Sequence, residues 1–550
     1  MNMKRAFALY ACLCVAPVAC KGNDDAPEDK GPVASKTDYP DARTLIRLAV
    51  AKAKKDTTAL YTLTNGDTIK LSEGTVSYYR SLLRRGKPVW SSGEKMLARG
   101  PQMLEALGNA TVDGLSPARY NYDAAQLILR AIEDGAEDSL KARYLADFDL
   151  VVTEGFNRYA ADLTRGSIDP DKAGLKWTIP RAHPWEENLL RMAIRGTSPA
   201  DIVERLRPQT PYYKRMMAAL ARHRDIQSKG GWPAVSKGKL VTGDSSATAA
   251  QLRTRLLASD DKREASLAAA GSSRPMVFDE DLRQALRHYQ ERHALEPDGA
   301  LGESTLRELN EPIDSRLDEV TLNLDRWRWL PHDLGKFFVL VNVAGFELEV
   351  VENNVAIERM NVVVGQPGWK TPIFVDTMEH IVVNPSWNVP ESIMREEIRP
   401  AMALNPNYLA EHNMQLTSDG TAKQLPGPDN ALGDYKFIFP NKDNIYLHDT
   451  PAQSLFSRTS RAFSHGCIRL ERPDDLAFLL ASKATRASPS DIRDKRASGK
   501  ESWVKVTRTL PVYILYFTVW VDEDGTTHVY HDVYGHDKAI APEAAKVAGV

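Results

Sequence analysis

Residues 464–470 read Ser464-His465-Gly466-Cys467-Ile468-Arg469-Leu470, the stretch of this chain that says most about its fold. The stretch contains Cys467, whereas the other three cysteines of the 550-residue chain, Cys12, Cys14 and Cys20, lie within the first twenty residues. Once those residues are set aside, Cys467 has no intrachain disulfide partner. A lone thiol beside glycine and histidine is either an inert buried group or a nucleophile, and the rest of the sequence favours the nucleophile.

The first residues have the pattern of an export signal. Two basic residues precede an apolar run at residues 6–19, which is too short to span a bilayer comfortably. We therefore expect residues 1–20 to be a signal peptide. The sequence Pro17-Val18-Ala19-Cys20 is similar to a lipobox, in which Cys20 would carry a lipid, and plain cleavage by signal peptidase is the alternative.

Residues 21–41 form a polar stretch that is rich in Asp, Gly and Pro and has little to bury, which is typical of a flexible tether. The chain has a formal net charge of −2 and no basic footprint, so nucleic acid is not expected as a partner. Its length allows about three or four domains of ordinary size. No segment after the first twenty residues is long and apolar enough to cross a bilayer.

A helical region follows the tether. Residues 42–243 carry apolar side chains at helical spacing, most clearly between residues 145 and 163. The region contains no recognisable catalytic cluster. We therefore expect a helical scaffold domain here.

A smaller helical unit is expected at residues 244–312. It has an apolar helical stripe at residues 278–290, a turn at Asp298-Gly299 and a helix start soon afterwards. An Ala/Ser-rich stretch at residues 259–275 is interpreted as an inserted loop. Up to Asn310 these residues resemble the peptidoglycan-binding domain that accompanies many enzymes of the cell wall.

Residues 320–537 change to a β-rich pattern. Strands are expected at 337–343, 346–351, 361–365, 381–384, 444–448, 512–521 and 527–533. The last two flank Asp524-Gly525, a strong hairpin signal. Between residues 389 and 433 the pattern breaks into helical and loop-like sequence, and we expect this long insertion to be a lid. Residues 538–550 are expected to form a tail. The predicted fold class is therefore multidomain α+β.

A second motif strengthens the interpretation of Cys467. His448 lies in the stretch Leu447-His448-Asp449-Thr450-Pro451, and fifteen residues separate it from Ser464. This histidine, followed at that spacing by Ser-His-Gly-Cys, resembles the signature of the L,D-transpeptidases. Flanking blocks such as Asn384-Pro385-Ser386-Trp387-Asn388-Val389-Pro390 are similar to the large proteobacterial branch of that family. That branch carries a helical scaffold, a peptidoglycan-binding domain and a catalytic domain with a lid.

The resemblance implies roles that suit the chemistry of each residue. Cys467 would be the nucleophile that forms a thioester, and His448 the general base and acid. The backbone at Gly466 would help to form an oxyanion hole, with His465 in a supporting role. Either the carboxylate of Asp449 or a backbone carbonyl just after His448 would orient the imidazole, and the sequence leaves both open.

Substrate-binding residues follow from the same resemblance. Arg469 would bind a carboxylate of the diaminopimelate-containing stem peptide, and a structural ion pair with Glu471 or Asp474 is the alternative. Further pocket residues are expected at Tyr446, Trp387, Asn388 and Ser464.

A metal site is not expected. His528, His531 and His536 cluster near the C-terminal end, but 528 and 531 would point to opposite faces of a strand and no carboxylate–histidine motif accompanies them. We interpret them as surface histidines. The resemblance implies neither a metal nor an organic cofactor.

The function implied is that of a periplasmic L,D-transpeptidase, anchored in the membrane only if Cys20 is lipidated. It would release D-alanine from a tetrapeptide stem through an acyl-enzyme on Cys467 and form a 3→3 peptidoglycan cross-link; carbapenems should acylate the same thiol. An L,D-carboxypeptidase using the same site and a catalytically silent wall-binding protein are the alternatives. Peptidoglycan stems and glycan are the expected partners, with wall-synthesis proteins as further candidates. The sequence leaves open the physiological acceptor, the balance between transfer and hydrolysis, and the oligomeric state.

Overall fold

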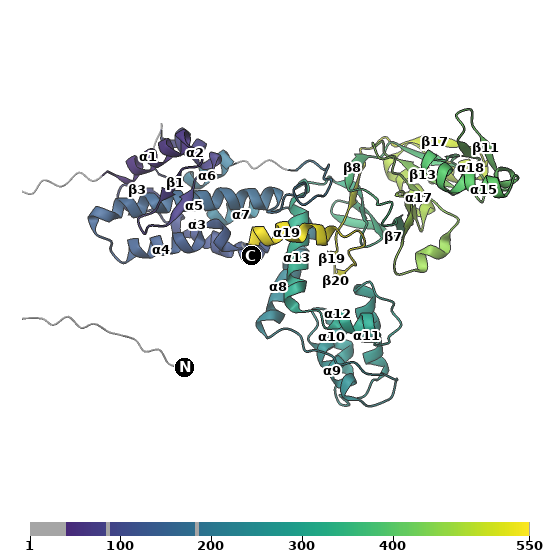
Figure 1. Cartoon of the computed structure of the whole chain (residues 1–550), viewed down its shortest axis with the longest axis horizontal. Coiled ribbons are helices and arrows are strands. Elements are labelled where there is room, and N and C mark those ends of the chain that lie inside the picture. Colours follow the sequence, from purple (N-terminus) through teal and green to yellow (C-terminus); the bar gives the residue numbers. More distant parts are fainter. Residues whose placement is uncertain (1–39, 84–87, 182–185, 549–550) are drawn as a thin grey trace, which may run out of the picture. The chain divides into compact units, whose positions relative to one another are not determined.

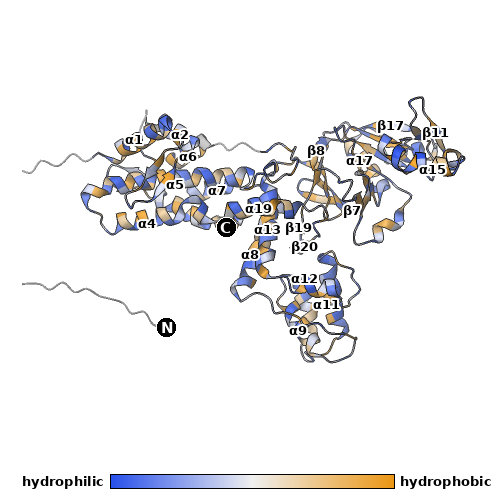
Figure 2. Cartoon of the chain, viewed as in Figure 1, coloured by the Kyte–Doolittle hydropathy of each residue, from blue (hydrophilic) through white to orange (hydrophobic). Residues whose placement is uncertain are grey.

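The computed structural model describes residues 40–83, 88–181 and 186–548 (Figure 1). The predicted signal peptide and nearly all of the predicted tether lie outside the described residues. From Asp41 onward the chain forms one compact unit. Hydrophobic and hydrophilic residues alternate along its helices (Figure 2), and no described helix is both long and apolar enough to span a membrane.

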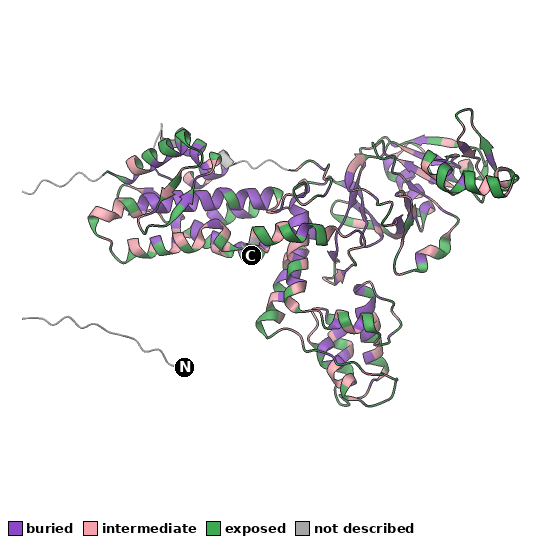
Figure 3. Ribbon diagram, viewed as in Figure 1, coloured by how far each residue is buried: buried purple, intermediate pink, exposed green. Residues whose placement is uncertain are grey.

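The first part of this unit is helical, as predicted. Its helices are α1 Ala42–Lys55, α2 Glu73–Leu83, α3 Arg99–Gly108, α4 Tyr122–Glu133, α5 Asp138–Arg165, α6 Glu186–Ile194, α7 Pro199–Leu206 and α8 Pro211–Ser228. Two small hairpins, β1 Leu60–Thr62 with β2 Thr68–Lys70 and β3 Ser91–Ser92 with β4 Lys95–Met96, lie between them. The 28-residue helix α5 is buried along most of its second half (Figure 3), because the other helices surround it.

Buried carboxylates on α5 hold the surrounding segments in place. Asp149 accepts hydrogen bonds from the Tyr79 hydroxyl, from the backbone amides of Val89 and Trp90, and from the Ser91 hydroxyl. Burial raises the pKa of this carboxyl to about 6, against the effect of these donors. The polar side chains of α5 therefore fix the connection between α2 and α3.

The small helical unit consists of α9 Ala247–Leu257, α10 Lys262–Ala270, α11 Glu280–Arg292 and α12 Glu303–Leu309 around its own apolar core. The prediction of a loop at residues 259–275 was wrong, because most of this stretch is α10. Its alanines favour a helix, and Asp261 caps the first turn through the amides of Arg263 and Glu264.

Helix α13, Ile313–Arg328, connects the helical parts to the β-rich domain and packs along α8. At its end Asp325 accepts from the backbone amides of Ser167 and Ile168 and from the guanidinium of Arg328. The indole of Trp329 donates to the same carboxylate. One buried acid therefore joins the end of α5 to the start of the β-rich domain.

The β-rich domain is built on an eleven-stranded sheet in the order β17-β9-β13-β14-β16-β7-β6-β5-β18-β8, with β15 paired to β7. Its strands are β5 Phe337–Asn342, β6 Glu347–Glu352, β7 Val355–Gly365, β8 Phe374–Thr377, β9 His380–Val383, β13 Tyr435–Ile438, β14 Leu447–His448, β15 Ala462–Ser464, β16 Ile468–Leu470, β17 Ser502–Lys505 and β18 Pro511–Leu515. Helices α17 Pro473–Ala484 and α18 Pro489–Ala497 follow β16. The apolar core of the domain extends to α8 and α13. The observed class is the predicted multidomain α+β.

The C-terminal part differs from the prediction in one respect. The expected strand at 512–521 is two strands, because β18 ends at Leu515 and β19, Val519–Val521, pairs instead with β20, Thr527–Val529. The hairpin around Asp524-Gly525 is present as predicted. Most of the expected tail belongs to α19, His536–Ala548, whose Ile540 is fully buried in a cluster with Trp329.

The predicted lid region is a small folded unit. It contains α14 Glu391–Ile393, a π-helical turn Met394–Ile398, α15 Arg399–Leu404, α16 Tyr408–Glu411, β11 Met414–Leu416 and β12 Ala422–Gln424, and β12 also pairs with β10 Trp387–Asn388. Val389, Met394, Ile398, Met414 and Ala422 form a core of its own. A segment with its own core can keep one shape against the sheet.

Gly166→Ala tests the junction at Asp325. Gly166 has φ +84°, and a Cβ atom there would lie 2.4 Å from the indole of Trp329, which is fully buried. We expect the substitution to lower the free energy of unfolding by at least about 2 kcal/mol, because the cost of the strained backbone and the cost of the clash add. Thermal melting measures this loss of stability. Gly174→Ala is the control, since Gly174 also has a positive φ but faces open space. Equal losses in both variants would contradict a role for the clash.

Candidate active site

The predicted site residues meet in one cavity of about 1280 Å³. Residues of the β-rich domain and of the lid line it, and so do Gly174, Leu175, Lys176 and Thr178 of the scaffold. The predicted residues that line it are Cys467, His448, Gly466, His465, Arg469, Tyr446, Trp387, Asn388 and Ser464. Asp449 does not line it.

The register of three strands explains why these residues meet. Strand β14 pairs in parallel with β16, with His448 opposite Arg469, and antiparallel with β13, with His448 opposite Lys436. Opposed residues share a face of a sheet, and residues two positions apart along a strand share it too. Continuing the two parallel strands by one residue brings Tyr446 and Cys467 to the same face.

The turn before Cys467 requires glycine. Gly466 has φ +112°, which side-chain-bearing residues rarely adopt. Its carbonyl accepts a hydrogen bond from the Thr371 hydroxyl at 2.7 Å, and its amide donates to the Ser464 hydroxyl at 3.1 Å. The Ser464 hydroxyl in turn donates to the Cys467 carbonyl at 2.5 Å. These bonds fix the backbone that presents the thiol.

Two of the predicted site residues shape this turn. Ser464 is buried, and its hydroxyl bridges the backbone on either side of the turn, whereas its predicted role in substrate binding stays a prediction. The Gly466 amide is also engaged, whereas the Cys467 amide has no acceptor among the described residues. The amide left to bind an oxyanion is therefore that of Cys467, and Gly466 contributes the conformation.

His448 is oriented by a backbone carbonyl. Its Nδ1 lies 2.5 Å from the carbonyl oxygen of Asp449, which can only accept, so the proton is on Nδ1 and Nε2 is free to accept. The carboxylate of Asp449 accepts instead from the amides of Asp434 and Thr450. Of the two orienting groups that the sequence left open, the structure shows the carbonyl and excludes the Asp449 side chain.

The thiol and the imidazole are both neutral at rest. Burial raises the pKa of Cys467, although Tyr446, Lys436 and Arg469 oppose this effect. Burial, followed by Arg469 and Lys436, lowers the pKa of His448 to about 3. The Cys467 Sγ lies 3.7 Å from the carbonyl of Asn444, which it contacts as a donor. The arrangement suits transfer of the thiol proton during attack on a substrate, not a preformed ion pair.

Tyr446 does more than line the cavity. Its hydroxyl interacts with the side chains of Cys467 and Trp387, and burial raises its pKa. The ammonium group of Lys436 lies over the Tyr446 ring, 3.8 Å from the ring centroid. Asn388 lies beside Trp387 on β10, and its side chain is exposed at the edge of the cavity. Tyr446 therefore links the lid, the thiol and Lys436.

Arg469 does not form the structural ion pair that the sequence allowed. Glu471 pairs with Arg472, and Asp474 pairs with Arg496. Arg469 has no carboxylate within ion-pair distance among the described residues, and its Nε is buried without a partner. The alternative of a structural ion pair is therefore not seen, and the binding of a carboxylate of the stem peptide stays a prediction for Arg469.

Contacts with the lid converge on His465. Its Nε2 lies 2.9 Å from a carboxylate oxygen of Glu397 in the π-helical turn, and its ring packs against Trp369, with centroids 5.4 Å apart. The motif and the lid are therefore in direct contact. Neither Glu397, Trp369 nor Lys436 was predicted, because no local pattern marks them; only the strand pairing and the fold of the lid bring them here.

The ion pair between the lid and His465 is exposed enough to be weak, about 0–1 kcal/mol. We expect Glu397→Gln to raise the rate of alkylation of Cys467 by iodoacetamide about twofold to fivefold, because the lid opens more often. The rate is followed by intact mass. Glu396→Gln is the matched control, since Glu396 pairs with Arg395. Equal changes in both variants would show that lid charge, and not this contact, controls access.

The raised pKa of Cys467 gives a second measurement. Alkylation by iodoacetamide requires the thiolate, so its rate should rise with pH and reach half its maximum above the ordinary value of 9.0. The midpoint is measured by following the alkylation rate of the wild-type protein between about pH 5 and pH 10.5, which is roughly the span over which thiols titrate. A midpoint below about 7 would instead show a thiolate–imidazolium pair at rest.

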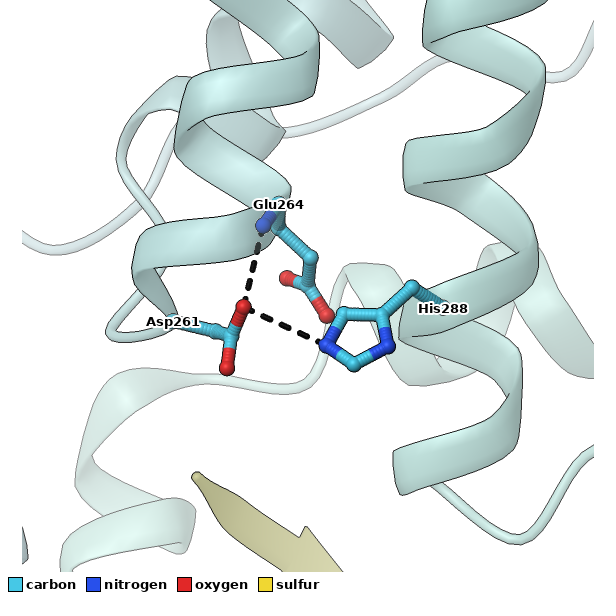
Figure 4. Close-up of side chains that lie close together, drawn as sticks. All are labelled: Asp261, Glu264 and His288. Atoms are coloured by element: carbon cyan, nitrogen blue, oxygen red, sulfur yellow. Dashed lines mark hydrogen bonds and ion pairs between the residues drawn. The ribbon is translucent and has the colours of Figure 1, made fainter. Parts of the chain in front are cut away.

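Among the described residues, Asp261, Glu264 and His288 form a group that could hold a metal ion (Figure 4). The chemistry of the group argues for structure instead. The carboxylate of Glu264 is buried against the guanidinium of Arg292, which occupies the place of a cation. Asp261 caps α10 and lies 3.3 Å from His288. The group ties α10 to α11.

The C-terminal histidines do not converge on one point. His531 is exposed, as predicted. His528 is partly buried and lies 2.9 Å from Asp522, and His536 packs edge-on against the ring of Tyr516. The prediction of surface histidines was therefore wrong for these two, because the strand and helix that carry them fold back onto the domain.

Family comparisons agree with this architecture. Residues 336–506 match the "L,D-transpeptidase catalytic domain", residues 75–220 match a "Scaffold domain", and residues 264–309 match a "Putative peptidoglycan binding domain". A protein of Haemophilus influenzae described as "Putative L,D-transpeptidase" is 33% identical over 244 residues, which cover 40% of this chain and 48% of that relative. The chain thus aligns with about half the length of that relative.

Solved structures give weaker matches. An L,D-transpeptidase from Mycobacterium smegmatis is 14% identical, with a TM-score of 0.18, over 33% of this chain and 58% of that one. The catalytic domain of an E. faecium L,D-transpeptidase is also 14% identical, with a TM-score of 0.17, over 33% of this chain and 99% of that one. At these TM-scores the superpositions support no argument.

The β-rich domain with its Cys467–His448 face is thus a member of the L,D-transpeptidase catalytic domain family. The same chain also matches a scaffold domain at residues 75–220 and a peptidoglycan-binding domain at residues 264–309.

Proposed function

We propose that the protein is a peptidoglycan L,D-transpeptidase that forms 3→3 cross-links through an acyl-enzyme on Cys467. The observation that carries the proposal is the placement of Cys467 and His448 on one face of two parallel strands, at the floor of a large cavity. The family match of the catalytic domain and the match of a peptidoglycan-binding domain support peptidoglycan as the substrate.

The first half-reaction forms the thioester. The donor is a tetrapeptide stem, and the bond attacked joins diaminopimelate at position three to D-alanine at position four. His448 Nε2 takes the thiol proton as Sγ of Cys467 attacks the carbonyl carbon, and the Cys467 amide binds the oxyanion. The intermediate then expels the D-alanine amine, which receives the proton from His448. The energy of the peptide bond is retained in the thioester.

The second half-reaction resolves the thioester. The side-chain amine of a second diaminopimelate attacks the carbonyl carbon, His448 removes a proton from this amine, and the Cys467 thiol leaves with a proton. Water in place of the amine would give an L,D-carboxypeptidase. The lid and the scaffold line the cavity, and a lid that closed over the thioester would favour the amine over water.

The protein would act in the periplasm, where its substrate lies. The proposal includes anchoring through a lipid on Cys20 and association with other wall-synthesis proteins. In the same proposal, the small helical domain contacts the glycan. Carbapenems should acylate Cys467, because their strained carbonyl is an acyl donor that the same thiol can attack. The mechanism uses only side chains and backbone of this chain.

The decisive experiment incubates the folded part of the protein, from Asp41 onward, with purified disaccharide-tetrapeptide. Mass spectrometry should show a dimer that has lost one D-alanine. Cys467→Ala should abolish the product, and His448→Gln should reduce its rate of formation by a factor of about 10²–10⁴, as expected when a general base is lost.

Asp449→Asn is the matched control, because the backbone carbonyl of Asp449, and not its side chain, contacts His448. It should retain most of the activity. Tripeptide as the sole product would change the assignment to carboxypeptidase. No product that depends on Cys467 would favour a wall-binding protein without activity.

A further inference from the structure

Two cationic side chains flank His448 on the floor of the cavity. Lys436 is opposite His448 on β13, and Arg469 is opposite it on β16, so one lies on each side of the imidazole on the same face. Opposed side chains have Cβ atoms about 4.5–5.5 Å apart. Both cations line the cavity and interact electrostatically with Cys467.

Neither cation has an anionic partner within ion-pair distance among the described residues. Both cations are half-buried, and the fully buried Arg292 and Arg328 of the same protein each contact a carboxylate. Lys436 instead lies over the ring of Tyr446, and the buried Nε of Arg469 has no acceptor. Half-buried cations that line a cavity without a partner are placed to bind an anion that arrives with a ligand.

The nearby acidic groups do not fill this place. Glu397 acts on Arg469 and Glu501 acts on Lys436, but only at a distance. Glu397 is paired with His465, and Glu501 accepts from the amide of Ser386 and the indole of Trp503. Both cations lower the pKa of Cys467, but burial outweighs them and the pKa stays above its ordinary value.

The position beside His448 indicates which part of a ligand they meet. His448 protonates the amine of the leaving amino acid, so that amine must come within hydrogen-bond reach of its imidazole. In a leaving α-amino acid one carbon atom separates the amine from the carboxylate. A carboxylate so placed lies beside the imidazole, within reach of Lys436 or Arg469.

We propose that Lys436 and Arg469 form a subsite for the free carboxylate of the leaving amino acid, which makes the enzyme select donors that end at the residue to be released. The identity of that residue as D-alanine rests on the proposed function. The subsite would select donors by charge and position, because a donor extended by one more residue would present an amide to two half-buried cations and leave them unpaired.

The first test does not depend on the proposed reaction. Cys467 is the sole cysteine from Asp41 onward, so its alkylation by iodoacetate and by iodoacetamide can be compared directly. Both reagents need the same thiolate, and their rate ratio therefore cancels its pKa. Relative to the methyl ester of N-acetylcysteine, the wild-type ratio of iodoacetate to iodoacetamide should be higher by about tenfold or more, as for a charge-assisted contact.

Variants test whether Lys436 and Arg469 cause the high ratio of the iodoacetate rate to the iodoacetamide rate. Lys436→Gln should lower this ratio about threefold to tenfold, whereas Lys436→Arg should retain most of it. Lys442→Gln is the matched control, because Lys442 lines the same cavity but is exposed and lies outside the three strands. A wild-type ratio equal to that of the small thiol, or an equal loss in the Lys442 variant, would overturn the proposal. The rate with iodoacetamide alone shows that the variants keep a folded cavity.

The second test uses the reaction itself. The wild-type enzyme should prefer a tetrapeptide donor with a free C-terminal carboxylate over the same donor as its C-terminal amide by about tenfold to a hundredfold in kcat/KM. Lys436→Gln should reduce this preference, mainly by lowering kcat/KM for the donor with the free carboxylate. Equal use of both donors by the wild type would overturn the subsite and leave the proposed function intact. If neither donor reacts, the proposed function fails, and the alkylation ratio alone decides whether the anion subsite stands.

Discussion

The site depends on the parallel pairing of β14 with β16. This pairing places His448 opposite Arg469 and, one step back along both strands, Tyr446 near Cys467. Parallel strands cannot be joined by a tight turn, so the chain must leave the sheet between them. Residues 449–467 make that connection, which contains the short helical turn Gln453–Ser457 and strand β15, and the spacing between the two motifs falls within it. A change in register by one residue would turn His448 away from the cavity.

In this site, backbone groups have roles that a sequence motif would suggest for side chains. A carbonyl orients His448, the conformation of Gly466 presents the thiol, and the amide of Cys467 remains available to an oxyanion. Ser464 serves the same turn. Burial lowers the pKa of His448 most, and the two cations beside it, Arg469 and then Lys436, act in the same direction.

Sequence reasoning was most successful where the information is local. Gly466 and Cys467 stand in one short stretch, His448 lies at a fixed distance before it, and the Asp524-Gly525 hairpin is encoded by its own turn. It failed where long-range packing decides. Lys436 is part of the site only because β13 pairs with β14, and the helix α10 was missed because composition alone was read as a loop.

The scaffold contributes a wall of the cavity. Gly174, Leu175, Lys176 and Thr178 line it, Thr178 donates to the carbonyl of Ile373 at the cavity edge, and Tyr212 on α8 donates to the buried Glu349 of β6. Cut free at its own boundary, the β-rich domain would keep the face of the sheet that carries Cys467 and His448 and lose one side of the space above it. The shape of the cavity is therefore a property of the whole folded chain, whereas Cys467 and His448 belong to one domain of it.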